Sequence, residues 1–370
     1  MRHFVSQPSD PGSRGHAFGT WHRAEIQKTV KTYEQIFAAV ALRAVPMEEV
    51  GEAAFAATST FSPSLATEIE AMAEGARVPV GKLAALNART EMLAACGAAT
   101  PGECSTVVLL RAGGASPVSV QTWDWHADLA DSWLIWTIQY PDGRVVHTLT
   151  EYGIVGKIGV NSDHRGLHVN ILHHERDGER VGLPVHVLAR AVLECPGSFT
   201  DALTLISSAP CSASSALTLV GYDGRESAVL SAEVSPLGPR YVRPDASGRL
   251  VRTNHFLDPA LSAGDREWAS GPDSYMRLDV LSRAVASLEH WDEQSVALAM
   301  ASHFGGSGAV CSHPEPGAGI GERYATLATV SFDLDACGLR VRPGGPCEAT
   351  EWWSSTTSAA AGGVPAGSPA

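Results

Sequence analysis

The sequence predicts an α+β protein built on antiparallel sheets. Three observations support this class: helical periodicity dominates the first hundred residues, short β-rich segments begin abruptly after residue 103, and helices and strands then follow in runs. Runs of one type favour α+β architectures, whereas regular β-α-β alternation favours a parallel sheet.

The N-terminal hundred residues are predicted to form several helices. One helical face is marked by apolar residues that recur at steps of four and three, namely Ile26, Val30, Tyr33, Phe37 and Val40. Ser62 and Pro63 form a helix start, because serine caps the first turn and proline tolerates the first helical position. Another helical run begins at Pro79.

Strands are predicted to begin where Thr100-Pro101-Gly102 ends the helical part. The expected strands cover residues 106–110, 118–122, 134–140, 145–150, 158–160 and 167–171. Pro141-Asp142-Gly143 is a turn sequence, so the strands on either side of it should form a hairpin.

The second half of the chain repeats this pattern. Helices are expected at residues 184–193, 200–206, 276–286 and 294–303, with a hairpin of 216–220 and 227–232 and a last strand at 327–334. The small, polar tail from Ser354 has little to bury and should be disordered. We therefore divide the chain into a helical segment 1–103, a body 104–350 and a disordered tail 351–370.

Composition excludes several classes of partner. The chain has 40 acidic and 27 basic residues, a net charge of −13, and no cluster of Lys or Arg, so nucleic acid is not an expected partner. No apolar run reaches the roughly 18 to 20 residues that a membrane span requires. The N-terminus lacks the apolar stretch of a secretory signal, which predicts a cytoplasmic protein without a membrane partner.

The cysteines predict neither a disulfide scaffold nor a structural zinc site. There are seven, at positions 96, 104, 195, 211, 311, 337 and 347, and no two are spaced as CxxC. Both kinds of site use clustered spacing. Cys211 and Cys311 are therefore expected to be buried structural thiols.

Four histidines lie close together in sequence, at positions 164, 168, 173 and 174. On a strand, His164 and His168 would lie about 13 Å apart at ~3.3 Å per residue. Two ligands of one zinc ion each bind at about 2.1 Å, so this pair is too far apart. The sequence predicts no metal site and no cofactor.

Cys104 is the candidate nucleophile. It lies where a glycine-containing loop meets the first strand. Cleavage between Glu103 and Cys104 would place a free α-amine, with a pKa of about 8, beside a thiol of about 8.5, so one residue would supply both base and nucleophile. A buried core thiol remains the alternative at this position.

Several motifs connect the chain to a known family. They occupy residues 12–19 (GSRGHAFG), 87–91 (NARTE), 104–106 (CST), 121–125 (QTWDW), 159–162 (GVNS), 252–256 (RTNHF) and 311–314 (CSHP), followed by Arg323 and 326–328 (TLA). In this order the chain resembles the penicillin acyltransferase family of self-processing N-terminal-nucleophile hydrolases.

The resemblance implies a four-layer αββα sandwich of two antiparallel sheets, with Cys104 at the end of a central strand. Self-cleavage would leave two fragments of the chain as each other's partners. By the same resemblance Asp124 orients the α-amine, Asn254 donates to the oxyanion and Arg323 pairs with Asp124. An oxyanion donor of this kind is typically worth about 10²–10³ in rate.

The expected substrates are small-molecule acyl donors, either amides or acyl thioesters, with water or an amine as acceptor. Trp123, Trp125 and His255 are the expected pocket residues. One alternative is a papain-like thiol hydrolase that pairs Cys104 with His255 and needs no cleavage. Another is a binding protein that no longer processes itself, because a fungal family member is cut after glycine, whereas Glu103 precedes Cys104 here.

Each of the three partner residues also has an ordinary structural interpretation. Asp124 would then be an edge-strand acid and Arg323 a surface cation. Asn254 would be a turn residue that bonds its own backbone, as isolated asparagines commonly do.

Overall fold

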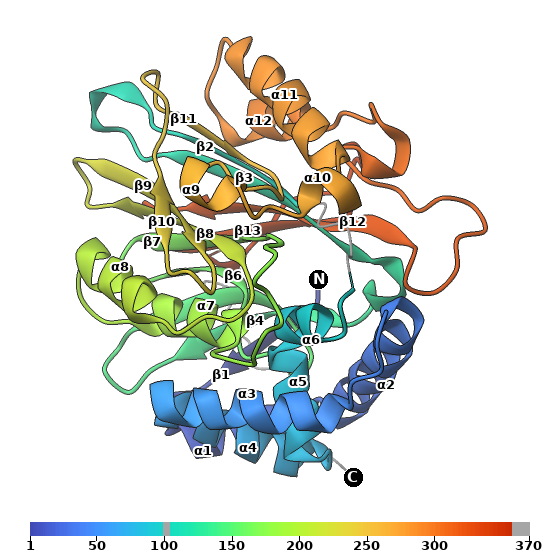
Figure 1. The fold of residues 1–370 in the computed structure, drawn as a ribbon. Helices are drawn as coiled ribbons and strands as arrows, with labels where there is room; N and C mark the ends of the chain where they lie inside the picture. Colours follow the sequence, from blue (N-terminus) through green and yellow to red (C-terminus); the bar gives the residue numbers. More distant parts are fainter. Residues whose placement is uncertain (99–103, 357–370) are drawn as a thin grey trace.

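The computed structural model describes residues 1–98 and 104–356, and within them the strands form two stacked sheets between layers of helices (Figure 1). The eight-stranded sheet has the order β1 (His3–Ser6), β4 (Trp133–Gln139), β5 (Val145–Glu151), β6 (Ile158–Asn161), β7 (Arg165–Ile171), β8 (Ser215–Tyr222), β9 (Ser227–Val234) and β10 (Arg240–Val242). The six-stranded sheet has the order β11 (Arg249–Arg252), β2 (Ser105–Leu109), β3 (Val118–His126), β12 (Tyr324–Asp333), β13 (Gly338–Pro343) and β14 (Trp353–Ser354).

Helices cover the outer face of each sheet. The N-terminal helices are α1 (Pro11–Trp21), α2 (Arg23–Val40), α3 (Met47–Phe61), α4 (Pro63–Ala76), α5 (Val80–Asn87) and α6 (Arg89–Ala95). With α7 (Val185–Glu194) and α8 (Phe199–Ser208) they lie on the side of the eight-stranded sheet, where α7 contacts β6 and β7 (Figure 1). The opposite layer contains α11 (Asp273–Ala286) and α12 (Glu293–Ala299), which contact β11 and β3. The four-layer α+β prediction is confirmed.

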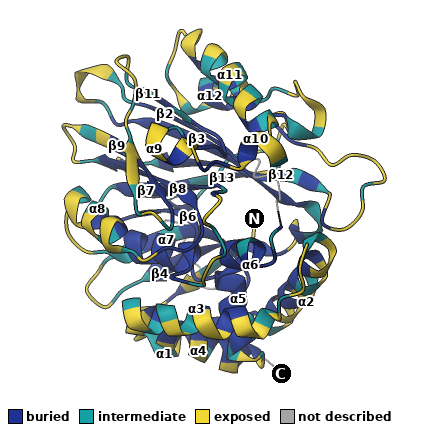
Figure 2. Cartoon of the chain, in the orientation of Figure 1, coloured by how far each residue is buried: buried dark blue, intermediate teal, exposed yellow. Residues whose placement is uncertain are grey.

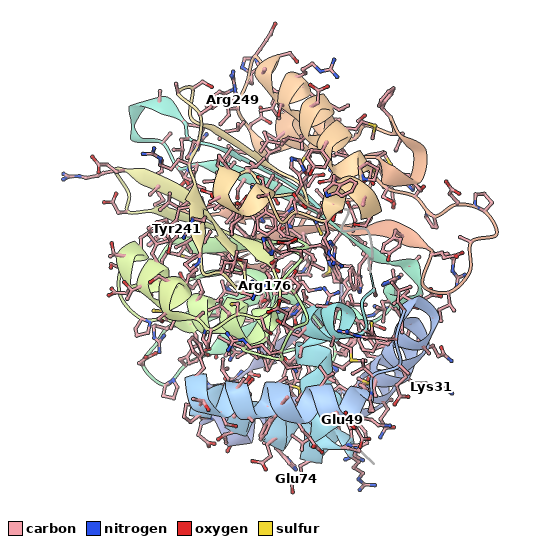
Figure 3. The ribbon with its side chains drawn as sticks, viewed as in Figure 1. Lys31, Glu49, Glu74, Arg176, Tyr241 and Arg249 are labelled. Atoms are coloured by element: carbon pink, nitrogen blue, oxygen red, sulfur yellow. The ribbon has the colours of Figure 1, made fainter. Side chains whose placement is uncertain are left out.

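The side chains of strand β2 pack into two different layers of the fold. Side chains alternate between the faces of a strand. Val107 and Leu109 belong to the apolar cluster shared with α11 and α12, whereas Cys104 and Val108 belong to the core between the sheets. Figure 2 shows most strand residues buried, whereas exposed residues lie mainly on helix faces and loops and on edge strands such as β10. Charged side chains such as Lys31, Glu49 and Glu74 lie at the periphery (Figure 3).

The glycines of motif 12–19 have a packing role. A Cβ on Gly15 would lie 2.1 Å from the carbonyl oxygen of Glu68, and one on Gly19 would lie 2.1 Å from that of Met72. These distances are impossible, so glycine at both positions lets α1 and α4 approach closely. Arg14 from the same motif forms a buried ion pair with Glu68. This motif therefore builds the helical layer and lies away from the chemistry.

Most predicted elements are confirmed, including the β4–β5 and β8–β9 hairpins. The sequence prediction was wrong in placing no strand after residue 334, because β13 pairs with β12 and β14 pairs with β13. Within the segment predicted to be disordered from residue 351, Trp353 and Ser354 are held by backbone pairing, and residues 357–370 lie outside the described residues. Of the helices that the structure describes, none is long and apolar enough to cross a membrane.

Candidate active site

Cys104 directly precedes β2 and is buried between the sheets, with 5% of its surface exposed. Its Sγ lies 3.7 Å from the carbonyl oxygen of Asp124 on the neighbouring strand β3. The amide of Ser105 donates to Thr122 Oγ1 at 3.2 Å. The thiol is therefore fixed at the point where β2 begins, as predicted, whereas Glu103 before it lies outside the described residues.

The backbone carbonyl of Cys104 is held from two directions. Asn170 Nδ2 on β7 donates to it at 3.0 Å, and an Arg277 guanidinium nitrogen on α11 donates at 3.2 Å. Asn170 is oriented in turn by Thr106 Oγ1, which donates to its Oδ1 at 2.9 Å. One bond crosses the space between the sheets and the other comes from the outer helix layer, so both layers position the candidate nucleophile.

Arg277 is a buried cation beside Cys104, and the sequence reasoning missed it. Its side chain is fully buried and also donates to Ser105 Oγ at 3.2 Å, to Asn254 Oδ1 at 3.1 Å and to Asp273 at 3.1 Å. A guanidinium is well suited to several simultaneous bonds because it carries five donors in a rigid plane. The sequence offered one signal, the Asp273–Arg277 spacing of four, but that spacing is common on solvent-exposed helix faces.

Asn254 lies beside Arg277, which donates to its Oδ1. It is fully buried, its backbone amide contacts Ser274 Oγ at 2.8 Å, and its Nδ2 donates to the Ile171 carbonyl at 2.8 Å. Its side chain thus bonds another strand and a buried arginine, rather than its own backbone. An amide nitrogen carries two hydrogens, and Ile171 accepts one of them.

The predicted pairing of Arg323 with Asp124 is wrong. Arg323 forms its ion pair with Asp128, and 41% of its side chain is exposed. The reason is local: Arg323 immediately precedes β12, where its carbonyl accepts from Ala127 N at 2.8 Å, beside the turn that contains Asp128. Asp124 is buried farther along β3, where its carboxylate contacts Thr122 Oγ1 at 3.4 Å.

Burial, and after it the negative charge of Asp124, raise the pKa of the Cys104 thiol to about 12, while the hydrogen bond to the Asp124 carbonyl and the charges of Lys157 and Arg277 act to lower it. The thiol is therefore protonated at neutral pH in the intact chain. Because a thiolate is the reactive form, a reaction at Cys104 requires a group that removes this proton.

A second buried cation, Lys157, lies in the same core and was also missed. Burial and the charge of Arg89 lower its pKa to about 7, against the opposing effect of Glu151. Its Nζ contacts Glu151 and lies 3.9 Å from the centre of the Trp123 ring. The corresponding cation over Trp125 is Arg89, at 3.8 Å. Both tryptophans are buried beneath these cations, and their role in a substrate pocket remains a prediction.

His255 is buried in contacts of its own. Its Nδ1 lies 2.8 Å from Ser274 Oγ, and its ring stacks on Tyr275 with centroids 4.0 Å apart. Burial, together with the charges of nearby arginines, lowers its pKa to about 4. It is therefore neutral at pH 7 and bonded to a hydroxyl, which does not favour the papain-like pairing with Cys104.

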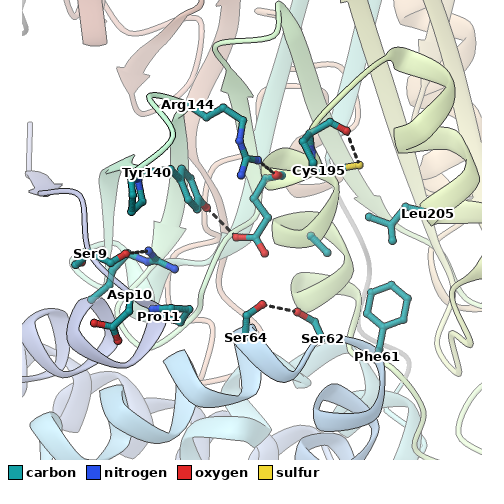
Figure 4. A pocket seen from close by; sticks show the side chains of 15 residues that line it. Ser9, Asp10, Pro11, Phe61, Ser62, Ser64, Tyr140, Arg144, Cys195 and Leu205 are labelled. Carbon is teal, nitrogen blue, oxygen red and sulfur yellow. Dashed lines mark hydrogen bonds between the residues drawn. The ribbon is translucent and has the colours of Figure 1, made fainter.

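Two surface depressions lie away from Cys104. One, of about 480 Å³, is lined by residues of α1, α4 and α7 together with Tyr140, Arg144 and Cys195 (Figure 4). The other, of about 550 Å³, is lined by residues that include Arg2 and Tyr152. Since Cys104 lines neither, we do not assign either as the site of chemistry.

Comparison with known proteins gives a match over most of the chain. Residues 111–346 match the family described as acyl-coenzyme A:6-aminopenicillanic acid acyl-transferase. The chain is 35% identical over 217 residues to the acyl-coenzyme A:6-aminopenicillanic-acid-acyltransferase 40 kDa form of Emericella nidulans, and this region covers 58% of each protein.

Solved structures also show similarity to this chain. An N-acylethanolamine-hydrolyzing acid amidase ortholog from Caenorhabditis elegans is 14% identical with a TM-score of 0.44, covering 62% of this chain and 93% of the other. Penicillin V acylase from Agrobacterium tumefaciens is 14% identical with a TM-score of 0.43, covering 68% and 85% respectively.

Proposed function

This chain belongs to the acyl-coenzyme A:6-aminopenicillanic acid acyl-transferase family, and we propose that it is an N-terminal-nucleophile enzyme in which Cys104 carries the acyl group. The observation that supports this most is the fixation of Cys104 at the start of β2, with its carbonyl held by Asn170 and Arg277. These two donors fix the backbone of the residue that carries the thiol, at the start of a central strand.

The first step is self-cleavage. Cys104 Sγ attacks the carbonyl carbon of Glu103, the carbon–nitrogen bond breaks, and the thiol proton passes to the leaving nitrogen. Water then hydrolyses the thioester, which leaves a Glu103 carboxylate and a Cys104 with free thiol and α-amine. The thiol has a raised pKa and is protonated at neutral pH. The new α-amine therefore supplies the base that removes the thiol proton.

Turnover uses the same sulfur. The α-amine accepts the thiol proton, the thiolate attacks the acyl carbon, and the carbonyl oxygen becomes an oxyanion. Asn254 donates its second amide hydrogen to that oxygen, while Arg277 keeps Asn254 and the Cys104 carbonyl in place. The donor's amine or thiol then leaves with a proton, and water or an amine takes the acyl group from Cys104.

The substrate class follows from the relative's name together with this chemistry. The Emericella protein is named for acyl transfer from an acyl-coenzyme A to the amine of 6-aminopenicillanic acid. We propose for this chain a small acyl thioester or amide as donor and an amine or water as acceptor. Asp124 is proposed to orient the α-amine from β3, whereas Arg323 lies outside this arrangement, beside Asp128.

Intact mass spectrometry of purified protein tests the proposal. Dividing 38.9 kDa in the ratio of 103 to 267 residues gives fragments of roughly 11 and 28 kDa. N-terminal sequencing of the larger fragment should begin Cys-Ser-Thr-Val. Active protein that remains a single chain of full mass would rule out this mechanism and favour a thiol hydrolase that needs no cleavage.

A further inference from the structure

Four potential metal ligands converge at one end of the six-stranded sheet. They are His303, Cys311, His313 and Cys347, here called the Cys₂His₂ cluster, and their ligand atoms all lie within 4.8 Å of one another. Two segments supply them: the connection between α12 and β12, which extends beyond the elements around it in Figure 1, and the loop after β13. No other such group occurs in the described parts of the chain.

Four of the six separations between the ligand atoms are close to those around a tetrahedral ion. Zinc binds sulfur at about 2.3 Å and imidazole nitrogen at about 2.1 Å, so a tetrahedron places two sulfurs about 3.8 Å apart, sulfur and nitrogen about 3.6 Å apart and two nitrogens about 3.4 Å apart. The two Sγ atoms lie 3.4 Å apart, and His313 Nε2 lies 3.7 Å from Cys311 Sγ and 3.3 Å from Cys347 Sγ. The two Nε2 atoms of His303 and His313 lie 3.2 Å apart.

The surrounding backbone holds this arrangement. Cys311 N donates to Ser302 O at 3.1 Å, which brings His303 beside Cys311. A Cβ on Gly345 would lie 2.5 Å from Cys311 Sγ, so glycine at this position leaves room for the sulfur. Cys311 is buried while the other three ligand residues are exposed, which gives an ion access from solvent.

We propose that the Cys₂His₂ cluster binds one zinc ion in a structural site. Two cysteines and two histidines are a ligand set typical of structural zinc, and four protein ligands leave no open position for chemistry. Zn²⁺ would displace two thiol protons to solvent, and the two thiolates would balance its charge. The sequence did not predict this site, because its ligands lie at positions 303, 311, 313 and 347 and include no CxxC pair.

The ion would brace the strand opposite Asp124. Ser312, between two of the ligands, exchanges hydrogen bonds with Thr326: Thr326 N donates to Ser312 O at 3.0 Å, and Ser312 N donates to Thr326 Oγ1 at 3.0 Å. Thr326 lies in register with Asp124 across the β12–β3 pair. Zinc at the cluster would thus fix β12 without taking part in acyl transfer.

A disulfide between Cys311 and Cys347 is the competing explanation. The sulfurs are 3.4 Å apart, compared with about 2.05 Å in a disulfide bond. A disulfide would also give the two imidazole nitrogens no reason to converge on the sulfurs. Zinc explains all four side chains at once.

Metal analysis of the full chain tests the proposal. The protein is purified without a histidine tag under reducing conditions, and zinc is measured by inductively coupled plasma mass spectrometry. We expect about one zinc per chain, falling to below about a tenth in Cys347→Ser and His303→Ala, whose exposed positions favour normal folding. Cys337→Ser is the matched control outside the cluster and should keep the metal.

Cobalt provides a second readout that is independent of enzyme activity. Co²⁺ added to metal-free protein should give the visible absorption bands of a tetrahedral thiolate site, and Cys347→Ser should lose them. The proposal is wrong if the reduced protein neither carries zinc nor binds added Zn²⁺ or Co²⁺. It is equally wrong if metal content is the same in the variants, or if the thiols are isolated as a disulfide that, once reduced, binds neither ion.

Discussion

The two cysteine sites of this protein are both associated with the β3–β12 strand pair, yet they are built for opposite purposes. Cys104 and Cys311 are both buried. At Cys104 an amide and a guanidinium donate to the backbone carbonyl, and the single sulfur lies against the carbonyl oxygen of Asp124. Around Cys311 a second sulfur and two imidazoles converge. The comparison teaches that burial alone does not distinguish the two thiols, and that the groups around each one are the basis for the different role that we propose for it.

The largest expected effect separates the two sites directly. Cys104→Ala should abolish both self-cleavage and activity, whereas Cys104→Ser should retain slow processing because a hydroxyl is a poorer nucleophile at neutral pH. Cys347→Ser at the Cys₂His₂ cluster should still yield cut protein, with a lower melting temperature. Gel analysis and differential scanning fluorimetry measure both. Normal cleavage in Cys104→Ala would show that Cys104 is not the nucleophile of self-cleavage.

Replacing Arg277 should have the second-largest effect on self-cleavage. Arg277→Ala removes a donor to Asp273 and to the Cys104 carbonyl, and since Asp273 is a quarter exposed, the cost should lie below the roughly 3–5 kcal/mol of breaking a fully buried charge pair. We expect uncut precursor to accumulate, measured as cut fraction by mass, together with a lower free energy of unfolding in urea.

Arg323→Ala is the matched control for Arg277→Ala. It removes a partly exposed pair with Asp128, and such pairs contribute about 0–1 kcal/mol. Its cut fraction should therefore stay close to that of the parent protein. If Arg323→Ala blocks cleavage while Arg277→Ala is cut normally, the two arginines have been assigned the wrong way round.

Asn254→Ala should reduce catalytic turnover more than it reduces self-cleavage. Its amide is proposed to bond an oxygen that becomes fully charged only in the transition state, so kcat and kcat/KM should fall together by about two to three decades, with KM little changed. Steady-state kinetics on the cut fraction measure this. Normal turnover in cut Asn254→Ala would remove it from the oxyanion role and leave it a structural link to Arg277 and Ile171.

His255 should show the smallest effect on chemistry and a measurable one on acid stability. Its pKa is lowered to about 4 in the folded protein, so between pH 4 and 6.5 the unfolded chain binds more protons and the free energy of unfolding rises with pH. His255→Gln should reduce that rise by at most about 3 kcal/mol, since one pKa unit corresponds to about 1.4 kcal/mol.

Activity distinguishes this role of His255 from the papain-like one. A buried neutral histidine bonded to Ser274 should be replaceable by Gln with kcat changed by less than about tenfold at pH 7, well below the 10²–10⁴ that a general base typically contributes. Urea titrations across the pH range and kinetics at pH 7 are the two measurements. Complete loss of activity in folded His255→Gln would favour the thiol hydrolase without self-cleavage.

Local sequence patterns determined much of this fold. The spacing from Ile26 to Val40 marked α2, and turn residues such as Pro141-Asp142-Gly143 marked hairpins, because these signals lie within a few residues of the structure they specify. The switch from helix to strand located Cys104 in the same way. Strand β13 was missed because Gly338–Pro343 is short, with only Leu339 and Val341 as apolar residues between its two arginines.

Tertiary structure alone decided which side chains meet. Asn170, Asn254 and Arg277 come to Cys104 from positions 66 to 173 residues away, and the ligands of the Cys₂His₂ cluster span positions 303 to 347. Their convergence follows from the stacking of two sheets and an outer helix, and no local period encodes it. Arg323 also shows that sequence does not predict long-range contacts. It pairs with Asp128 because β12 begins beside the turn that contains Asp128. The sequence thus determined most of the elements and pointed to the candidate nucleophile, while packing between distant elements placed Arg277 beside it.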